Sequence, residues 1–135
     1  MLDPFDEMIL YLRLAQAYRA RLQLPDRDRA LVLAGTCAHV MKMPELAEFC
    51  RQLVLQNNPG HMLRKYDTFA EATQDSDFGV FLRQVRRKIS PERAESQLIE
   101  LDYHCDVRRT DYQTDAEFAA AVMGVDAQWI QENFG

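Results

Sequence analysis

The chain has 135 residues, with 16 Lys and Arg against 21 Asp and Glu, a formal charge of −5 and 47% hydrophobic residues. This size and apolar content predict one domain and exclude a disordered or collagen-like chain, because burial of apolar surface can offset the entropy lost on ordering. The sequence has no apolar run of about 18 residues, and its acidic N-terminus differs from the basic start of a signal peptide, so we expect a cytoplasmic protein with no membrane contact.

The negative charge is confined to the end of the chain. Residues 1–60 carry 7 basic and 7 acidic side chains, residues 61–109 carry 9 and 9, and residues 110–135 carry 5 acidic side chains and no basic one. The sequence therefore predicts a charge-balanced helical body over residues 1–109. Residues 110–135 are expected to form an acidic helical hairpin that packs on the same domain.

Three helices, each with a proline near its start, are predicted in the first part of the chain. The first spans residues 4–22 after an N-cap at Asp3, the second spans residues 25–42, and the third spans residues 44–57 before a turn of Asn, Pro and Gly. The apolar positions of the first helix cover more than one stripe, which indicates a central helix or one covered by a second subunit. A homo-oligomer through residues 4–22 therefore stays open as an alternative.

Three further helices are predicted in the middle of the chain, over residues 61–73, 76–89 and 91–101. The helix over 76–89 carries an apolar stripe at helical spacing, formed by Phe78, Phe81, Leu82, Val85 and Ile89. Ser90 and Pro91 supply the N-cap and the first turn of the helix that follows. No strand pattern competes with these helices, so the predicted fold class is all-α.

Residues 103–114 lack helical periodicity and are longer than the usual connection between helices, so we expect a functional loop, with a short extended segment allowed over 103–112. Beyond it, Thr114 and Glu117 form a capping box for a helix that Gly124 ends, and Asp126 caps a last helix. The expected architecture is seven or eight helices packed as antiparallel hairpins, in a helical bundle or a short solenoid.

The spacing of small residues and proline in residues 28–60 resembles one tetratricopeptide repeat. Gly35 is followed by Ala47 and then by Pro59 at the intervals of that helical hairpin, although the family favours an aromatic residue where this chain has Arg51. The resemblance implies a hairpin that binds a protein or peptide without catalysis. The alternative is that the prolines mark only the starts and ends of unrelated helices.

Residues 116–135 resemble a helix-turn-helix. The resemblance is carried by Ala120, the turn pair Gly124 and Val125, and Ile130 in the second helix. It implies a DNA-docking element, but residues 110–135 contain no Lys or Arg, and affinity for DNA comes largely from neutralising phosphates. We therefore expect no nucleic-acid partner for this element and favour docking on a basic protein surface.

The cysteines and histidines are spread along the chain without the spacing of a metal site. Cys37, Cys50 and Cys105 are odd in number, so we expect free thiols, with Cys37 and Cys50 buried as small apolar residues. Cys37 and His39 are two positions apart and would point to different sides of a helix. We expect no metal and no cofactor.

Two clusters of polar residues are candidates for a small site. In the loop, His104 and Cys105 combine a base with a thiol, and Arg108 and Arg109 could stabilise a thiolate. In the turn before residue 62, Asn58 and His61 could present polar groups to a ligand. The alternatives are a loop pinned by local hydrogen bonds and ion pairs, and a plain helix end, and we assign no catalytic residue.

Arg83, Arg86 and Arg87 share the face opposite the apolar stripe of their helix, where they could bind phosphate or an acidic partner. The run is flanked by Asp75, Asp77, Glu92 and Glu95, which favours an ion-paired surface over nucleic-acid binding. Trp129, in the acidic hairpin, marks a second candidate surface for a partner.

These patterns predict a small non-catalytic protein-interaction or regulatory module whose protein partner contacts Arg83, Arg86, Arg87 and Trp129. Two alternatives stay open. One is a DNA-associated regulator that uses the terminal helix-turn-helix, and the other is a small enzyme that uses His104 with Cys105, or His61.

Overall fold

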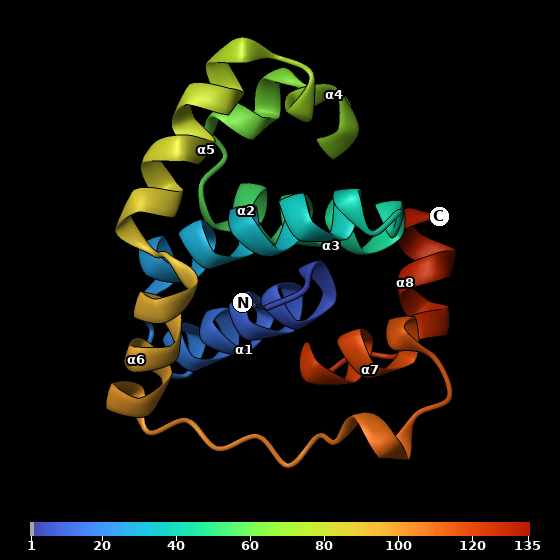
Figure 1. The fold of residues 1–135 in the computed structure, drawn as a ribbon. Coiled ribbons are helices and arrows are strands. Elements are labelled where there is room, and N and C mark those ends of the chain that lie inside the picture. Colours follow the sequence, from blue (N-terminus) through green and yellow to red (C-terminus); the bar gives the residue numbers. More distant parts are fainter. Residues whose placement is uncertain (1) are drawn as a thin grey trace.

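The computed structural model describes residues 2–135, and within that range the chain forms eight α-helices and two 3-10 turns without any strand (Figure 1). The predicted all-α fold class is therefore confirmed. The elements are α1 (Pro4–Ala20), α2 (Leu24–Val40), α3 (Pro44–Asn57), η1 (Met62–Lys65), α4 (Phe69–Thr73), α5 (Ser76–Lys88), α6 (Pro91–Leu101), η2 (Arg109–Asp111), α7 (Asp115–Val122) and α8 (Ala127–Phe134). None of these helices has the length and apolarity that crossing a bilayer requires.

Helix α1 is the central element of the fold. It packs most extensively on α2 and also contacts α6 and α7, while α3 packs on α2 (Figure 1). Every side chain from Met8 to Tyr18 is buried or half-buried within the chain. The broad apolar surface of this helix is thus explained by internal packing, and a homo-oligomer through residues 4–22 has no support.

Prolines start four of the helices, as the sequence predicts. A proline lies in the first turn of α1, α2, α3 and α6, and Pro59 follows the end of α3. These positions account for the regular proline spacing without a repeat. Helices α2 and α3 do form a packed hairpin across residues 28–60, so a tetratricopeptide-like role for that hairpin stays a prediction.

The prediction of one helix over residues 61–73 is wrong. The segment forms η1 and the short α4, separated at Tyr66 to Thr68. Side chains of α3 satisfy the backbone at this break, because Arg51 donates to the Tyr66 carbonyl and Glu48 accepts from the N–H of Phe69. Thr68 then caps α4 through the Glu71 N–H. A continuous helix would give up these contacts.

The turns that end α1, α2 and α7 share one pattern of hydrogen bonds. In each, a residue with positive φ (Leu22 at 58°, Lys42 at 58° and Gly124 at 75°) follows the helix, and its N–H and that of the next residue bond back to the last turn. The first two helices therefore end at Ala20 and Val40, two residues earlier than predicted. The turn at Gly124 is the one that the helix-turn-helix resemblance marks.

The acidic segment packs through its apolar residues on the same hydrophobic core as the body. Phe118, Ala120 and Ile130 are buried in that core, with α7 against α1 and α8 against α3. Figure 1 shows α8 and α5 at opposite edges of the molecule. The acidic hairpin therefore does not cover the basic side of α5 within one chain. The predicted loop over residues 103–114 is present, with no regular structure over 103–108 and η2 over 109–111.

One close approach fixes α4 against α2. A Cβ atom built on Gly35 would lie 2.6 Å from Cε2 and 2.9 Å from Cζ of Phe69. Phe69 cannot readily withdraw, since its ring is buried and packs edge-on against Phe78 with ring centroids 5.8 Å apart. Glycine at position 35 is therefore required by packing, although it lowers the intrinsic stability of a helix.

We expect Gly35→Ala to lower the free energy of unfolding by about 1–3 kcal/mol, because the added methyl group overpacks the Phe69 contact. Gly79→Ala is the matched control: it lies inside α5, where a Cβ would meet only the Arg83 guanidinium at 3.9 Å. That change should stabilise the protein by up to about 1 kcal/mol through helix propensity. Urea unfolding followed by circular dichroism measures both, and equal effects of the two substitutions would contradict the packing.

Candidate functional site

The loop that carries His104, Cys105, Arg108 and Arg109 is attached to α1 and α7 by hydrogen bonds. Arg13 of α1 donates to the Val107 carbonyl at 3.3 Å, and Arg109 pairs with Asp115 of α7 at 3.0 Å. His104 Nε2 lies 3.0 Å from Asp102 Oδ1, with exposed fractions of 83% and 77% for the two side chains. Arg108 is also exposed. His104 and Cys105 therefore lie on a loop that is attached at both ends, and a chemical role for them stays a prediction.

The structure brings Asn58 and His61 together in one depression of about 410 Å³. Its lining is formed by Pro25, Asp28, Arg29, Asn57, Asn58, His61 and Phe81. The Nδ1 atom of His61 accepts from the Leu63 N–H at 3.1 Å, so the neutral ring carries its proton on Nε2. Because its lone pair is already used, His61 is poorly placed to act as a general base for a bound substrate.

Two of the three cysteines are buried thiols. Burial raises the pKa of Cys37 and of Cys50 to about 12, which opposes formation of the thiolate that reacts or binds metal. Cys105 is half-exposed in the loop. Within residues 2–135, no group of three metal-binding side chains comes together.

The exposed side of α5 carries three arginines that we call the arginine face: Arg83, Arg86 and Arg87. Phe78 and Val85 on the opposite side are buried in the core, so packing of the apolar stripe turns the arginines outward. Arg86 lies 3.8 Å from Glu7 of α1, a long contact. Among the residues that the structure describes, Arg83 and Arg87 have no carboxylate within 4.0 Å.

The ion pairs expected between this face and the flanking acids are not formed in the described part of the chain. Asp75 is instead the N-cap of α5, accepting from the Asp77 N–H at 2.9 Å and from the Tyr66 hydroxyl at 2.8 Å. These hydrogen bonds lower the pKa of Asp75, because they stabilise its ionised form. The arginine face therefore keeps most of its positive charge available to a partner.

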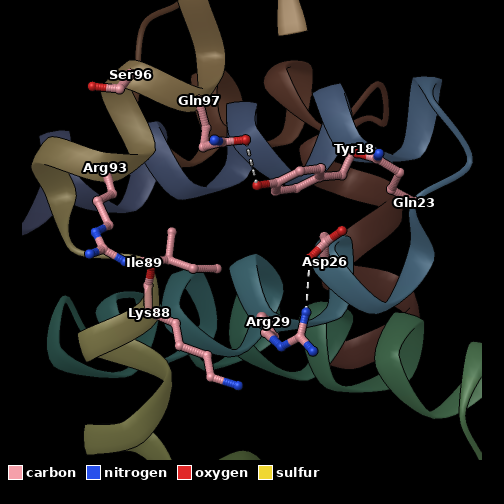
Figure 2. A pocket seen from close by; sticks show the side chains of 9 residues that line it. All are labelled: Tyr18, Gln23, Asp26, Arg29, Lys88, Ile89, Arg93, Ser96 and Gln97. Carbon is pink, nitrogen blue, oxygen red and sulfur yellow. Dashed lines mark hydrogen bonds and ion pairs between the residues drawn. The ribbon is translucent and has the colours of Figure 1, made fainter. Parts of the chain in front are cut away.

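A groove of about 560 Å³ lies where the α5–α6 corner meets the α1–α2 turn (Figure 2). We call it the basic groove. It is lined by Tyr18, Gln23, Asp26, Arg29, Lys88, Ile89, Arg93, Ser96 and Gln97, which come from four helices and the two turns that join them in pairs. Figure 2 shows Lys88 and Arg93 on one side of the groove, and Asp26 with Arg29 on the other.

The floor of the basic groove is fixed to the core. Tyr18 and Ile89 are each only 7% exposed, and the Tyr18 hydroxyl lies 3.2 Å from Gln97 Oε1, to which it donates. Burial raises the pKa of Tyr18, and the nearby Asp26 adds to the effect, so the phenol stays protonated. Beneath the groove, the buried Tyr11 hydroxyl donates to the Ile89 carbonyl at 2.7 Å. This bond holds the α5–α6 corner on α1.

The walls of the basic groove carry more positive than negative charge. Arg29 pairs with Asp26 at 2.9 Å, while Arg93 donates to the Lys88 carbonyl at 3.4 Å. Within residues 2–135, neither Lys88 nor Arg93 has a carboxylate within 4.0 Å. The local sequence marks Lys88 and Arg93 as part of a basic run, but it gives no sign that Arg29 and Tyr18 join them from other helices.

Trp129 belongs to a different surface from the arginine face. It is 42% exposed, and its ring packs edge-on against Phe49 of α3 and Phe134, with centroid distances of 5.5 and 5.7 Å. Helix α8 and helix α5 lie at opposite edges of the molecule (Figure 1). The predicted partner-binding residues therefore form two separate surfaces.

Comparison with protein-family models, with curated proteins and with solved structures finds no match to this chain. The functional argument consequently rests on the geometry of the arginine face, the basic groove and the surface around Trp129.

The burial of two cysteines leads to a simple test of the packing. We expect dithionitrobenzoate to modify one thiol, Cys105, rapidly in the native protein, and all three after unfolding in guanidinium chloride. Cys105→Ser should abolish the rapid phase and leave the slow one. Rapid modification of Cys37 or Cys50 in the native protein would contradict their position in the core.

The half-buried His61 leads to a prediction about pH. Burial lowers the pKa of His61 below its ordinary value of 6.5, against a smaller opposing effect of Asp28. Well above pH 6.5 the imidazole is neutral in both the folded and the unfolded chain. As the pH falls below 6.5, the unfolded chain binds a proton before the folded chain does, so the free energy of unfolding decreases. Between about pH 7.5 and about pH 5, the free energy of unfolding of His61→Gln should therefore fall less than that of the wild type. Urea unfolding at each pH tests this, and equal slopes would contradict it.

Proposed function

We propose that the protein is a non-catalytic interaction module that binds an acidic segment of a protein partner on the arginine face. The observation that carries this proposal is that Arg83 and Arg87 are exposed without carboxylate partners in the described residues, and Arg86 has only a long contact. Guanidinium groups bind carboxylates in a bidentate geometry, and three of them on one helix face match the acidic side chains of a short segment.

The size of the arginine face favours a protein segment over a nucleic acid. Residues 83 and 87 lie about 6 Å apart along the helix axis, which spans few phosphates of a duplex, whereas typical DNA-binding proteins contact about 6–10 phosphates. The chain as a whole carries a formal charge of −5, and its acidic hairpin would repel a long polyanion. A short acidic segment avoids that repulsion.

The surface around Trp129 supports a second contact, with a partner of opposite charge. Trp129 is partly exposed on α8 beside Asp126 and Glu132, both of which are exposed. A partly exposed Trp within an acidic surface suits a basic partner, because the ring adds apolar contact to the attraction between charges. In the proposed module, the two edges of the molecule bind segments of opposite charge.

The proposal is tested with a short fluorescein-labelled peptide rich in Asp and Glu, titrated with the protein at low salt and followed by fluorescence anisotropy. We expect the wild type to bind and added salt to weaken the complex. The triple variant Arg83→Glu, Arg86→Glu, Arg87→Glu should bind at least about tenfold more weakly, because attraction becomes repulsion.

A matched control changes the net charge equally at other exposed basic residues. This control is the triple variant Lys42→Glu, Arg64→Glu, Arg108→Glu. Its three positions lie outside α5 and the basic groove. At about 0.15 M salt, where charges more than about 8 Å apart are largely screened, this variant should keep binding within about threefold. Equal loss in both triple variants, or no binding by the wild type, would overturn the proposal, as would tighter binding of a mixed-sequence DNA duplex than of the peptide.

A further inference from the structure

We propose that the basic groove is a binding site for a phosphate monoester. The groove shares no residue with the arginine face, so this inference does not depend on the function proposed above. It rests on the convergence of three cationic side chains from different helices around one hollow: Arg29 of α2, Lys88 of α5 and Arg93 of α6 (Figure 2).

The charge of the lining matches that of the ligand. Asp26 offsets one of the three cations through its ion pair with Arg29, while Lys88 and Arg93 have no carboxylate partner in the described residues. A phosphate monoester carries about −1.5 to −2 charges near neutral pH. One such group neutralises the two free cations, whereas a single carboxylate leaves one of them unbalanced.

Two of the three cations of the groove make a hydrogen bond within the described chain. Asp26 orients the Arg29 guanidinium at 2.9 Å, and Arg93 is tied to the Lys88 carbonyl at 3.4 Å. The hydroxyl of Ser96 adds a neutral polar group on the α6 wall, whereas the Gln97 amide is already bonded to Tyr18 and Glu100. Donors arriving from several directions suit the three terminal oxygens of a phosphate better than a planar carboxylate.

The groove also has room for the group that carries the phosphate. Its volume of about 560 Å³ exceeds what one phosphate fills, and its floor presents the buried ring of Tyr18 and the side chain of Ile89. An aliphatic carrier would rest on this floor while its phosphate meets the cations. Because the Tyr11–Ile89 hydrogen bond anchors the floor to α1, the site exists before the ligand binds.

The experiment uses the ¹⁵N-labelled 135-residue chain at about 0.15 M salt and three probes: inorganic phosphate, a phosphoserine peptide, and the same peptide with Glu in place of phosphoserine. Shifts of the backbone amides of Ser96 and Gln97 report on the groove. We expect the phosphoserine peptide to shift both amides in a saturable manner, and the Glu peptide to bind at least about tenfold more weakly. Saturable binding of inorganic phosphate assigns the site to small phosphates as well, whereas binding of the phosphopeptide alone assigns it to a phosphorylated protein.

The matched variants separate this site from the arginine face. Lys88→Gln with Arg93→Gln removes two exposed charges from the groove and should weaken phosphopeptide binding at least about tenfold. Arg83→Gln with Arg87→Gln removes the same charge from the arginine face. This double variant should keep the affinity for the phosphopeptide within about twofold of the wild type. Absence of saturable shifts with any phosphate probe, equal affinity for the Glu peptide, or equal loss in both double variants would overturn the phosphate site. None of these outcomes bears on binding of the acidic peptide to the arginine face.

Discussion

Enclosure of α1 by α2, α6 and α7 is the constraint on which the rest of the structure depends. A helix that is apolar around so much of its circumference is stable in water only when several elements cover it. Both the next helix, α2, and the later helices α6 and α7 must therefore pack on α1. The buried Tyr11 hydroxyl adds a directional bond to this packing, since it must find an acceptor and does so at the Ile89 carbonyl. Ser90 and Pro91 set where α6 begins, and the Tyr11 bond attaches that corner to α1 and so positions the basic groove.

Much of the fold could be predicted from the sequence because its determinants are local. Prolines in first turns, caps at Asp3, Ser90 and Asp126, and the Thr114–Glu117 capping box all act within one helical turn. The break within residues 61–73 could not be predicted, because Arg51 and Glu48 satisfy its backbone from another helix. The early ends of α1 and α2 could not be predicted either, because Leu22 and Lys42 adopt the positive φ at which glycine usually ends a helix.

The candidate sites likewise include one that local sequence predicts and one that depends on contacts between helices. Helical spacing identifies the arginine face, because Arg83, Arg86 and Arg87 lie on one helix opposite an apolar stripe. Spacing cannot reveal that Lys88 and Arg93 face Arg29 across a groove, since that meeting depends on how α2 packs beside the α5–α6 corner. Nor can composition show that the acidic hairpin and the arginine face lie at opposite edges of the molecule (Figure 1). With charge separated in this way, the electrostatic field of the protein orients a charged partner as it approaches.

The origin of the groove walls has a consequence for the order of events during synthesis. One side comes from residues 18–29 and the other from residues 88–97. An emerging chain can pair α1 with α2 and α2 with α3 early, because these helices are neighbours in sequence, but the groove is absent until α6 has left the ribosome and docked on α1. A nascent or truncated chain ending before α6 therefore cannot present this surface. The groove therefore forms only after α6 has been made and has docked on α1.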